Sequence, residues 1–149
     1  MSITNTLKRI TNSEQSLSTM PLRLIAGIIF TAHGAQKLFA WFGGYGLQGT
    51  GQWMDSIGLS PGYLMALMAG SAEFFGGLLL IAGLLTRPTS FVLAITMVVA
   101  IFSVHFENGL FMSANGYEFA LILLAASVSL VISGAGKLSL DNLLARRFS

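Results

Sequence analysis

The chain contains no cysteine. This absence excludes disulfides, thiolate metal sites, iron–sulfur clusters and cysteine nucleophiles, so redox chemistry would need a bound cofactor or another subunit. Charged residues are scarce as well, at 9% of 149 residues, against about 25% in soluble domains. The net charge is only +2 and the basic residues are not clustered, which argues against nucleic acid as a partner. A soluble monomer is not expected.

Hydrophobic residues, at 54%, are what the sequence has in abundance. Four runs approach the about 20 mostly apolar residues that a membrane-spanning helix needs, at residues 21–42, 62–85, 88–107 and 116–135. Pro21, Pro61 and Pro88 each stand where one of these helices would begin, a position that tolerates the missing N–H group. We therefore predict an all-α fold, a four-helix transmembrane bundle.

The few basic residues are distributed asymmetrically. Lys and Arg precede or open the first run, separate the second from the third, and follow the fourth, whereas the loops at about 43–60 and 108–115 contain none. The positive-inside rule places both termini in the cytoplasm and these two loops outside. The expected organisation is a cytoplasmic tail, a membrane domain and a second cytoplasmic tail, at 1–20, 21–136 and 137–149.

Several connecting segments carry local signals. We expect Ser60 to cap the second helix, and Asn115 with Glu118 to form a capping box for the fourth. The run "GGYGLQGTG" at 43–51 lacks the lysine and the strand–helix context of a phosphate loop, so we interpret it as a flexible external lid. The tail "LSLDNLLARRF" predicts an amphipathic helix with leucines opposite two arginines.

Polar residues inside the apolar runs are the candidate site. His33 and Lys37 are four residues apart, on one face of the first helix, and Glu73 reaches a similar depth on the second. An ionised group at the bilayer centre costs about 2.5–3.5 kcal/mol and is usually partnered. We predict that Glu73 pairs with His33, and with Lys37 as a further partner, while Gln36 completes the hydrogen bonding.

Small residues accompany Glu73 on one stripe of the second helix and would let the first helix approach closely; these are Ala66, Gly70 and Gly77. At the outer end we expect a polar mouth of Lys37, His105, Glu107 and Glu118. An aromatic belt would surround this mouth, formed by Trp41, Phe42, Tyr45 and Trp53.

Simpler interpretations stay open for these residues. Lys37 could snorkel to the outer surface, Glu73 with His33 could be a structural clamp, and Glu118 could be only a helix cap. Haem is rejected, because helix rise separates His33 from His105 by about 10 Å in depth. The sequence also has no dinucleotide fingerprint, flavin motif or metal-ligand set.

The order of these stretches resembles the DoxX family of small four-helix membrane proteins, over about residues 20–145. The stretches that carry the resemblance are "RLIAG", "HGAQKLF", "GGYG", "EFFGGLLLIAGLLTR", "NGYEFALILLAASVSL" and "GAGKLSLD". The closing motif reads Gly134-Ala135-Gly136 where the family often has Gly-Pro-Gly.

The resemblance implies a redox or quinone connection in a bacterial inner membrane. Family members are commonly labelled oxidoreductases, and some relatives are subunits of thiosulfate:quinone oxidoreductase. The family's recurrent polar residues match Arg23, His33, Lys37, Glu73 and Glu118 by position.

The leading hypothesis is a quinone-associated redox component in which Lys37 or His33 donates to a quinone carbonyl and Glu73 orients the histidine or passes a proton. Electrons would come from a redox partner subunit. A small-solute transporter or channel is a second hypothesis, and a non-catalytic scaffold for a soluble redox enzyme is a third. Glycine-lined helix faces also allow a homo-oligomer.

Overall fold

The computed structural model describes residues 16–147, so most of the expected N-terminal tail lies outside the described part. Every regular element within that range is helical. The longer helices are α2 (Thr19–Phe39), α3 (Gly46–Ser56), α4 (Gly62–Ala82), α5 (Thr86–Ala100), α6 (Glu118–Ser133) and α7 (Leu140–Arg147). The short helical turns are η1 (Trp41–Gly43), η2 (Ile101–His105), η3 (Phe106–Asn108) and η4 (Met112–Ala114).

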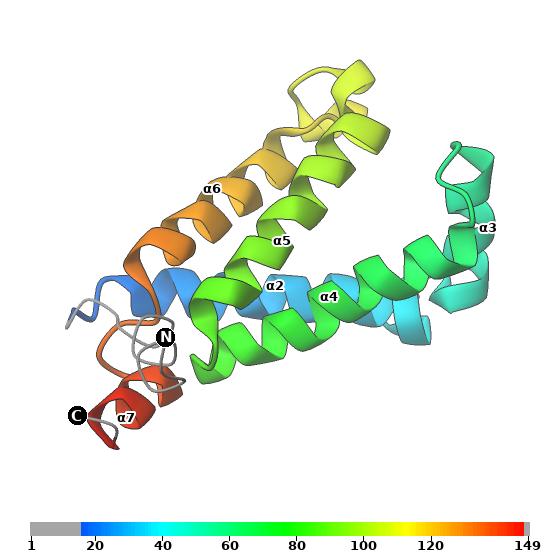
Figure 1. Ribbon diagram of the computed structural model, residues 1–149. Helices are drawn as coiled ribbons and strands as arrows, with labels where there is room; N and C mark the ends of the chain where they lie inside the picture. The colour runs from blue at the N-terminus through cyan, green and yellow to red at the C-terminus, as the bar shows by residue number, and fades with distance from the viewer. Residues whose placement is uncertain (1–15, 148–149) are drawn as a thin grey trace, which may run out of the picture.

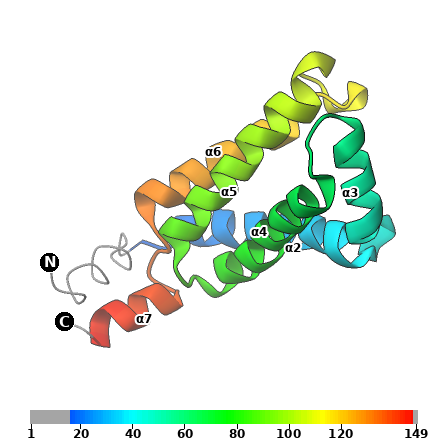
Figure 2. The same ribbon diagram turned by 45° about the vertical axis from the view of Figure 1, so that its right-hand side comes forward.

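The long helices form two antiparallel pairs, α2 with α4 and α5 with α6 (Figure 1). The pairs meet at the end where α7 lies and diverge toward the opposite end, where α3 packs beside α4 (Figure 2). We call these the closed end and the open end. This divergence gives the open end the room in which a site can form.

Two helical segments, Gly62–Ala82 and Thr86–Asn108, are long and apolar enough to cross a membrane. The apolar helix α6 is shorter. Large hydrophobic side chains on all four long helices point outward, among them Ile28, Phe75, Phe91 and Ile122, each more than half exposed. Such wide apolar exposure is unusual on a soluble monomer and suits contact with lipid.

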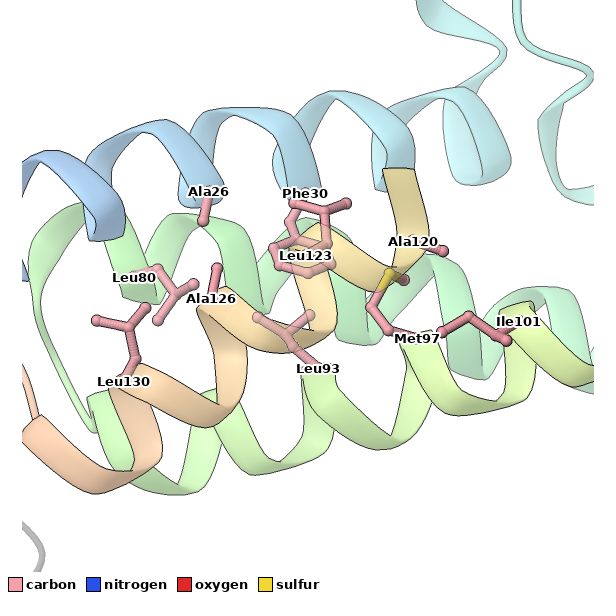
Figure 3. Packing of buried hydrophobic residues seen from close by; sticks show 10 residues of the cluster. All are labelled: Ala26, Phe30, Leu80, Leu93, Met97, Ile101, Ala120, Leu123, Ala126 and Leu130. Atoms are coloured by element: carbon pink, nitrogen blue, oxygen red, sulfur yellow. The ribbon is translucent and has the colours of Figure 1, made fainter. Parts of the chain in front are cut away.

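The buried core lies between the two helix pairs (Figure 3). Phe30 of α2, Leu80 of α4, Leu93 of α5 and Leu130 of α6 are each at most 1% exposed. Because these side chains come from four different helices, their burial holds the two pairs together. The remaining members of the cluster are Ala26, Met97, Ile101, Ala120, Leu123 and Ala126.

Glycines set the distance between α2 and α4. A Cβ atom added to Gly34 would lie 2.6 Å from the Cα atom of Phe74, and one added to Gly27 would lie 2.8 Å from the Gly77 carbonyl oxygen. The small-residue stripe that the sequence predicted on α4 is confirmed, since Ala66, Gly70, Glu73 and Gly77 are all buried. The two backbones can therefore pack in direct contact.

At the closed end, Arg23 is almost fully buried and caps the C-terminus of α4. Its Nη1 atom donates to the carbonyl oxygens of Leu80 and Ile81 at 2.6 and 2.8 Å, and its Nη2 atom donates to that of Leu138 at 2.8 Å. A cation near the C-terminal carbonyls of a helix is favourable. Arg23 therefore joins three segments of the chain.

Asp141 of α7 caps the adjacent helix end, the N-terminus of α5. Its Oδ1 atom accepts from the Leu85 N–H group at 2.7 Å and its Oδ2 atom from the Thr86 N–H group at 2.9 Å. Its own N–H group donates to the Gly83 carbonyl at 2.8 Å. The turn between α4 and α5 is thus tied to α7 by complementary charges and backbone bonds.

Three local predictions are wrong. Residues 43–51 are not a lid loop, because from Gly46 onward they belong to α3, in which Gly51 packs against Gly62 and Tyr63 of α4. Glycine here serves close packing and not flexibility.

Ser60 does not cap α4; its Oγ atom donates to Asp55 at 2.7 Å. Asn115 and Glu118 do not form a capping box, because Glu118 is the first residue of α6 and accepts from the Met112 N–H group instead. Helix bounds otherwise differ from the predicted runs by a few residues; α2, for example, ends at Phe39 because Ala40 is left-handed.

Replacing Gly34 with alanine tests the glycine contact. Alanine favours isolated helices, but here its methyl group would overlap the α4 backbone, so we expect a loss of about 2 kcal/mol in the free energy of unfolding. Unfolding in mixed detergent micelles measures this loss, with the exposed Ile28→Ala of the same helix as the control. Equal stability of Gly34→Ala and wild type would contradict the contact.

Candidate functional site

An ion pair between α2 and α4 is the centre of the candidate site. The Lys37 Nζ atom lies 2.6 Å from the Glu73 Oε2 atom. Glu73 sits midway along α4 with its side chain 5% exposed, whereas Lys37, in the last turn of α2, is 23% exposed. The glycine-mediated contact of α2 and α4 brings these helix faces together, so a buried carboxylate acquires a cation as its partner.

The expected pairing of His33 with Glu73 is not what the structure has. Among the described residues, no hydrogen bond joins His33 to Glu73; the imidazole ring instead packs against Phe119 of α6, with ring centroids 5.7 Å apart. The reason is side-chain length, because the flexible lysine stem of Lys37 lets its ammonium group reach Glu73 from one turn further out.

A cavity of about 100 Å³, which we call the inner cavity, lies at the ion pair. His33, Lys37, Glu73 and His105 supply its polar lining, and the remaining walls are apolar: Phe30, Met97, Ala100, Phe119, Ala120 and Leu123. This volume accommodates a few water molecules, and four polar groups could hold them. The structure therefore gathers both predicted histidines with Lys37 and Glu73 around one small polar space.

A second and larger cavity, the outer cavity, lies between the end of α2 and α3. Its volume is about 650 Å³, within the roughly 300–1,000 Å³ typical of small-molecule sites. The lining residues are Gln36, Lys37, Gly43, Gly44, Tyr45, Gly49, Thr50, Gln52 and Trp53. Lys37 also lines the inner cavity, so one side chain connects the two spaces.

Three other predicted site residues lie elsewhere. Gln36 lines the outer cavity and its amide donates to the Phe42 carbonyl at 3.3 Å, not to Glu73. Trp41 packs on Phe39 with centroids 5.2 Å apart and lines neither cavity. Glu118 accepts from the Met112 N–H group at 2.6 Å in the loop before α6. Of the predicted polar mouth, only Lys37 and His105 share the inner cavity, whereas Glu107 and Glu118 do not line it.

The sequence analysis missed Thr50 and Gln52, which line the outer cavity from α3. The sequence did contain a helical spacing here, since Gly46, Thr50 and Met54 recur at intervals of four. The structure buries all three residues. The four glycines between 43 and 49 concealed this signal because they favoured a loop.

Asp55 attaches α3 to α4. Its Oδ1 atom accepts from the Ser60 Oγ atom at 2.7 Å and from the Gly62 N–H group at 2.8 Å, at the first residue of α4. These two bonds, to Ser60 first and then to Gly62, lower the pKa of the Asp55 carboxyl below its ordinary value. The wall of the outer cavity is thus held in place by a carboxylate at a helix N-terminus.

Within residues 16–147, no group of three or more His, Asp or Glu side chains is arranged to hold a metal ion. The inner cavity combines two imidazoles, an ammonium and a carboxylate. This set can exchange protons with a bound molecule and can donate hydrogen bonds to an acceptor oxygen.

Comparison with known proteins adds family information. The DoxX family model matches residues 18–106. The chain is 36% identical over 130 residues to "Putative oxidoreductase CatD" of Bacillus subtilis, covering 87% of this chain and 89% of that protein. It is 30% identical to "Inner membrane protein YqjF" of Escherichia coli, with 90% and 97% covered. No solved structure is significantly similar.

A double-mutant cycle tests the ion pair. Lys37→Met leaves the buried Glu73 without its cation and should lower the free energy of unfolding by about 3 kcal/mol. Glu73→Gln should cost less, because Lys37 can turn toward the outer cavity. The double variant should regain most of the loss, as measured by unfolding in mixed micelles. If Lys37→Met and Glu73→Gln were additive, and His33→Ala and Glu73→Gln were strongly coupled, the predicted pairing of His33 with Glu73 would be correct instead.

A pH titration tests the attachment of α3. Since the pKa of Asp55 is lowered by folding, its contribution is complete above the unfolded pKa and is lost as the pH falls through the folded pKa, below about 4. In a Trp41→Phe background, Trp53 on α3 should therefore show a fluorescence red shift in that acidic range. Asp55→Asn should remove this titration, and an unchanged pH curve in that variant would contradict the attachment.

Proposed function

We propose a function on the premise that this chain belongs to the DoxX family. The chain is a multi-pass protein of the bacterial inner membrane and a quinone-associated redox component. Membrane location is supported by relatives named as membrane proteins and by two span-length apolar helices within the described residues. The oxidoreductase name of one relative supports the redox part of the proposal, and the cavity geometry supports the quinone part.

We take α2, α4, α5 and α6 as the four spans, with the closed end and both termini in the cytoplasm. α2 is less apolar than α4 because it carries Arg23, His33 and Lys37, but Arg23 is buried and His33 and Lys37 line the interior. α6 has 16 residues, about 24 Å of helix, so its ends must lie close to the hydrocarbon boundaries.

The position of Lys37 in both cavities carries the functional proposal. The outer cavity, at about 650 Å³, can accept a quinone ring, whereas the inner cavity, at about 100 Å³, cannot take a ring together with a tail. A ring in the outer cavity would have Tyr45 and Trp53 as aromatic walls. The Lys37 ammonium group would form its polar end, with Gln36, Thr50 and Gln52 as further hydrogen-bonding groups.

This arrangement suits the chemistry of a quinone carbonyl. A reducing partner adds electrons to the ring, and negative charge then develops on the carbonyl oxygens. The Lys37 ammonium group donates a hydrogen bond to such an oxygen and stabilises that charge. His33, Glu73 and His105 lie around the inner cavity behind Lys37 and can replace a proton that leaves it.

A transporter is less well supported by the geometry. Toward the closed end from Glu73 the interior is closely packed, with Leu80, Leu93 and Leu130 at most 1% exposed. The polar side chains at that end, Thr86, Ser90 and Ser127, are buried just as completely, so close packing leaves a polar solute no open route. The polar interior is therefore open toward one side of the membrane only.

Tryptophan fluorescence tests quinone binding directly, since the chain has only two tryptophans. Trp53 lines the outer cavity and Trp41 does not. A short-tailed ubiquinone should quench Trp53 saturably in the Trp41→Phe variant, because the ring lies against it. In the matched Trp53→Phe variant, the quenching of Trp41 should be weak and linear.

Adding Lys37→Met and Glu73→Gln together to the Trp41→Phe background should weaken saturable quenching at least tenfold, through loss of the charged hydrogen bond. Linear, unsaturable quenching of both tryptophans in all variants would contradict a quinone site and would favour the scaffold hypothesis.

A further inference from the structure

Helix α7 buries its polar residues and exposes its apolar ones, the reverse of a surface helix in a soluble protein. Its polar residues Asp141 and Asn142 are 1% and 3% exposed, whereas Leu138, Leu140 and Leu143 in and beside the helix are 59%, 43% and 62% exposed. A helix on a water-facing surface buries its apolar face. The outward face of α7 therefore fits an apolar surrounding better than it fits water.

Polar contacts fix this orientation. Asp141 caps α5, as described above, and the Asn142 Nδ2 atom donates to the Lys137 carbonyl at 2.7 Å. The Asn142 N–H group also donates to the Ser139 Oγ atom at 3.2 Å, and Arg23 holds the Leu138 carbonyl. Because these partners are specific, α7 cannot turn its leucines inward without losing the caps of α4 and α5.

Positive charge accompanies the exposed leucines. Lys137, Arg146 and Arg147 are all exposed, and Leu140, Leu143 and Arg147 recur at helical spacing along one face. α7 also lies at the closed end, beside the turn that joins α4 to α5 (Figures 1 and 2). For a bundle that spans the membrane, this is the level of the headgroups of the cytoplasmic leaflet.

We propose that α7 lies in the boundary of the cytoplasmic leaflet and binds anionic phospholipid headgroups. Its exposed leucines contact the upper acyl chains, and Lys137, Arg146 and Arg147 contact the phosphates, the arrangement expected of an interfacial amphipathic helix. Charge complementarity selects an anionic lipid surface as the occupant over a protein partner. This inference needs the membrane orientation proposed above but does not need a quinone.

Single-cysteine labelling tests the location of α7, and the absence of native cysteine makes it clean. An environment-sensitive fluorophore is attached to Leu143→Cys in nanodiscs that contain phosphatidylglycerol. The lipid-facing Ile95→Cys and the exposed Ser56→Cys of α3 serve as references. Lipid-borne quenchers should quench the Leu143 label nearly as well as the Ile95 label and much more than the Ser56 label.

Lipid retention tests the charge requirement. Native mass spectrometry of protein from equal mixtures of phosphatidylglycerol and phosphatidylcholine should show wild type enriched in phosphatidylglycerol. Arg146→Gln with Arg147→Gln should reduce the enrichment, by up to about fivefold per arginine. The matched Arg146→Lys and Arg147→Lys variant keeps the charge and should keep the enrichment.

A Leu143 label that behaves like the Ser56 label would overturn the interfacial location and indicate that water or a protein partner covers α7. Equal retention of both lipids by wild type would overturn the anionic preference. Saturable quinone quenching of Trp53 is read separately, so failure here leaves the proposed function standing, and the reverse also holds.

Discussion

The backbone contact between α2 and α4 is the constraint on which the site depends. Gly27 and Gly34 on one helix, and Gly77 on the other, leave no room for a Cβ atom beside the facing backbone. With this contact in place, Lys37 lies within reach of Glu73, and a carboxylate at mid-helix can be buried with a partner. Larger side chains would separate the helices and leave Glu73 facing an apolar interior alone.

The two ends of the molecule are built for different purposes. At the closed end, Arg23 and Asp141 satisfy the C-terminus of α4 and the N-terminus of α5, so backbone groups that lack helical partners are bonded in a buried place. At the open end the helix pairs diverge, and polar cavities take the place of apolar packing. Close packing at one end and space at the other are what the proposed ligand site requires.

The sequence predicted the long helices well because hydrophobic run length and proline position act locally. It also named the four polar residues that line the inner cavity, since a charged group within an apolar run needs a partner. It could not tell which partner, because His33 and Lys37 share a helix face; in the structure the longer lysine reaches Glu73 and the imidazole packs against Phe119.

Three features lay beyond the sequence for different reasons. Residues 43–51 are ambiguous because glycine serves both loops and close helix contacts, and only the position of α4 shows which applies. The cap formed by Asp141 joins residues 56 positions apart in the chain, and no local pattern reports such a pairing. Helix α7 was expected to be amphipathic, but which face it buries became known only from the structure.

The central claim is that Lys37, held by Glu73, forms the polar end of a ligand site in the outer cavity. The most direct measurement is mass spectrometry of small molecules extracted from the detergent-purified protein, comparing wild type with the folded Lys37→Met/Glu73→Gln variant. The account predicts a quinone retained near one per chain by wild type and lost in the variant. Only bulk phospholipid in both proteins would contradict it.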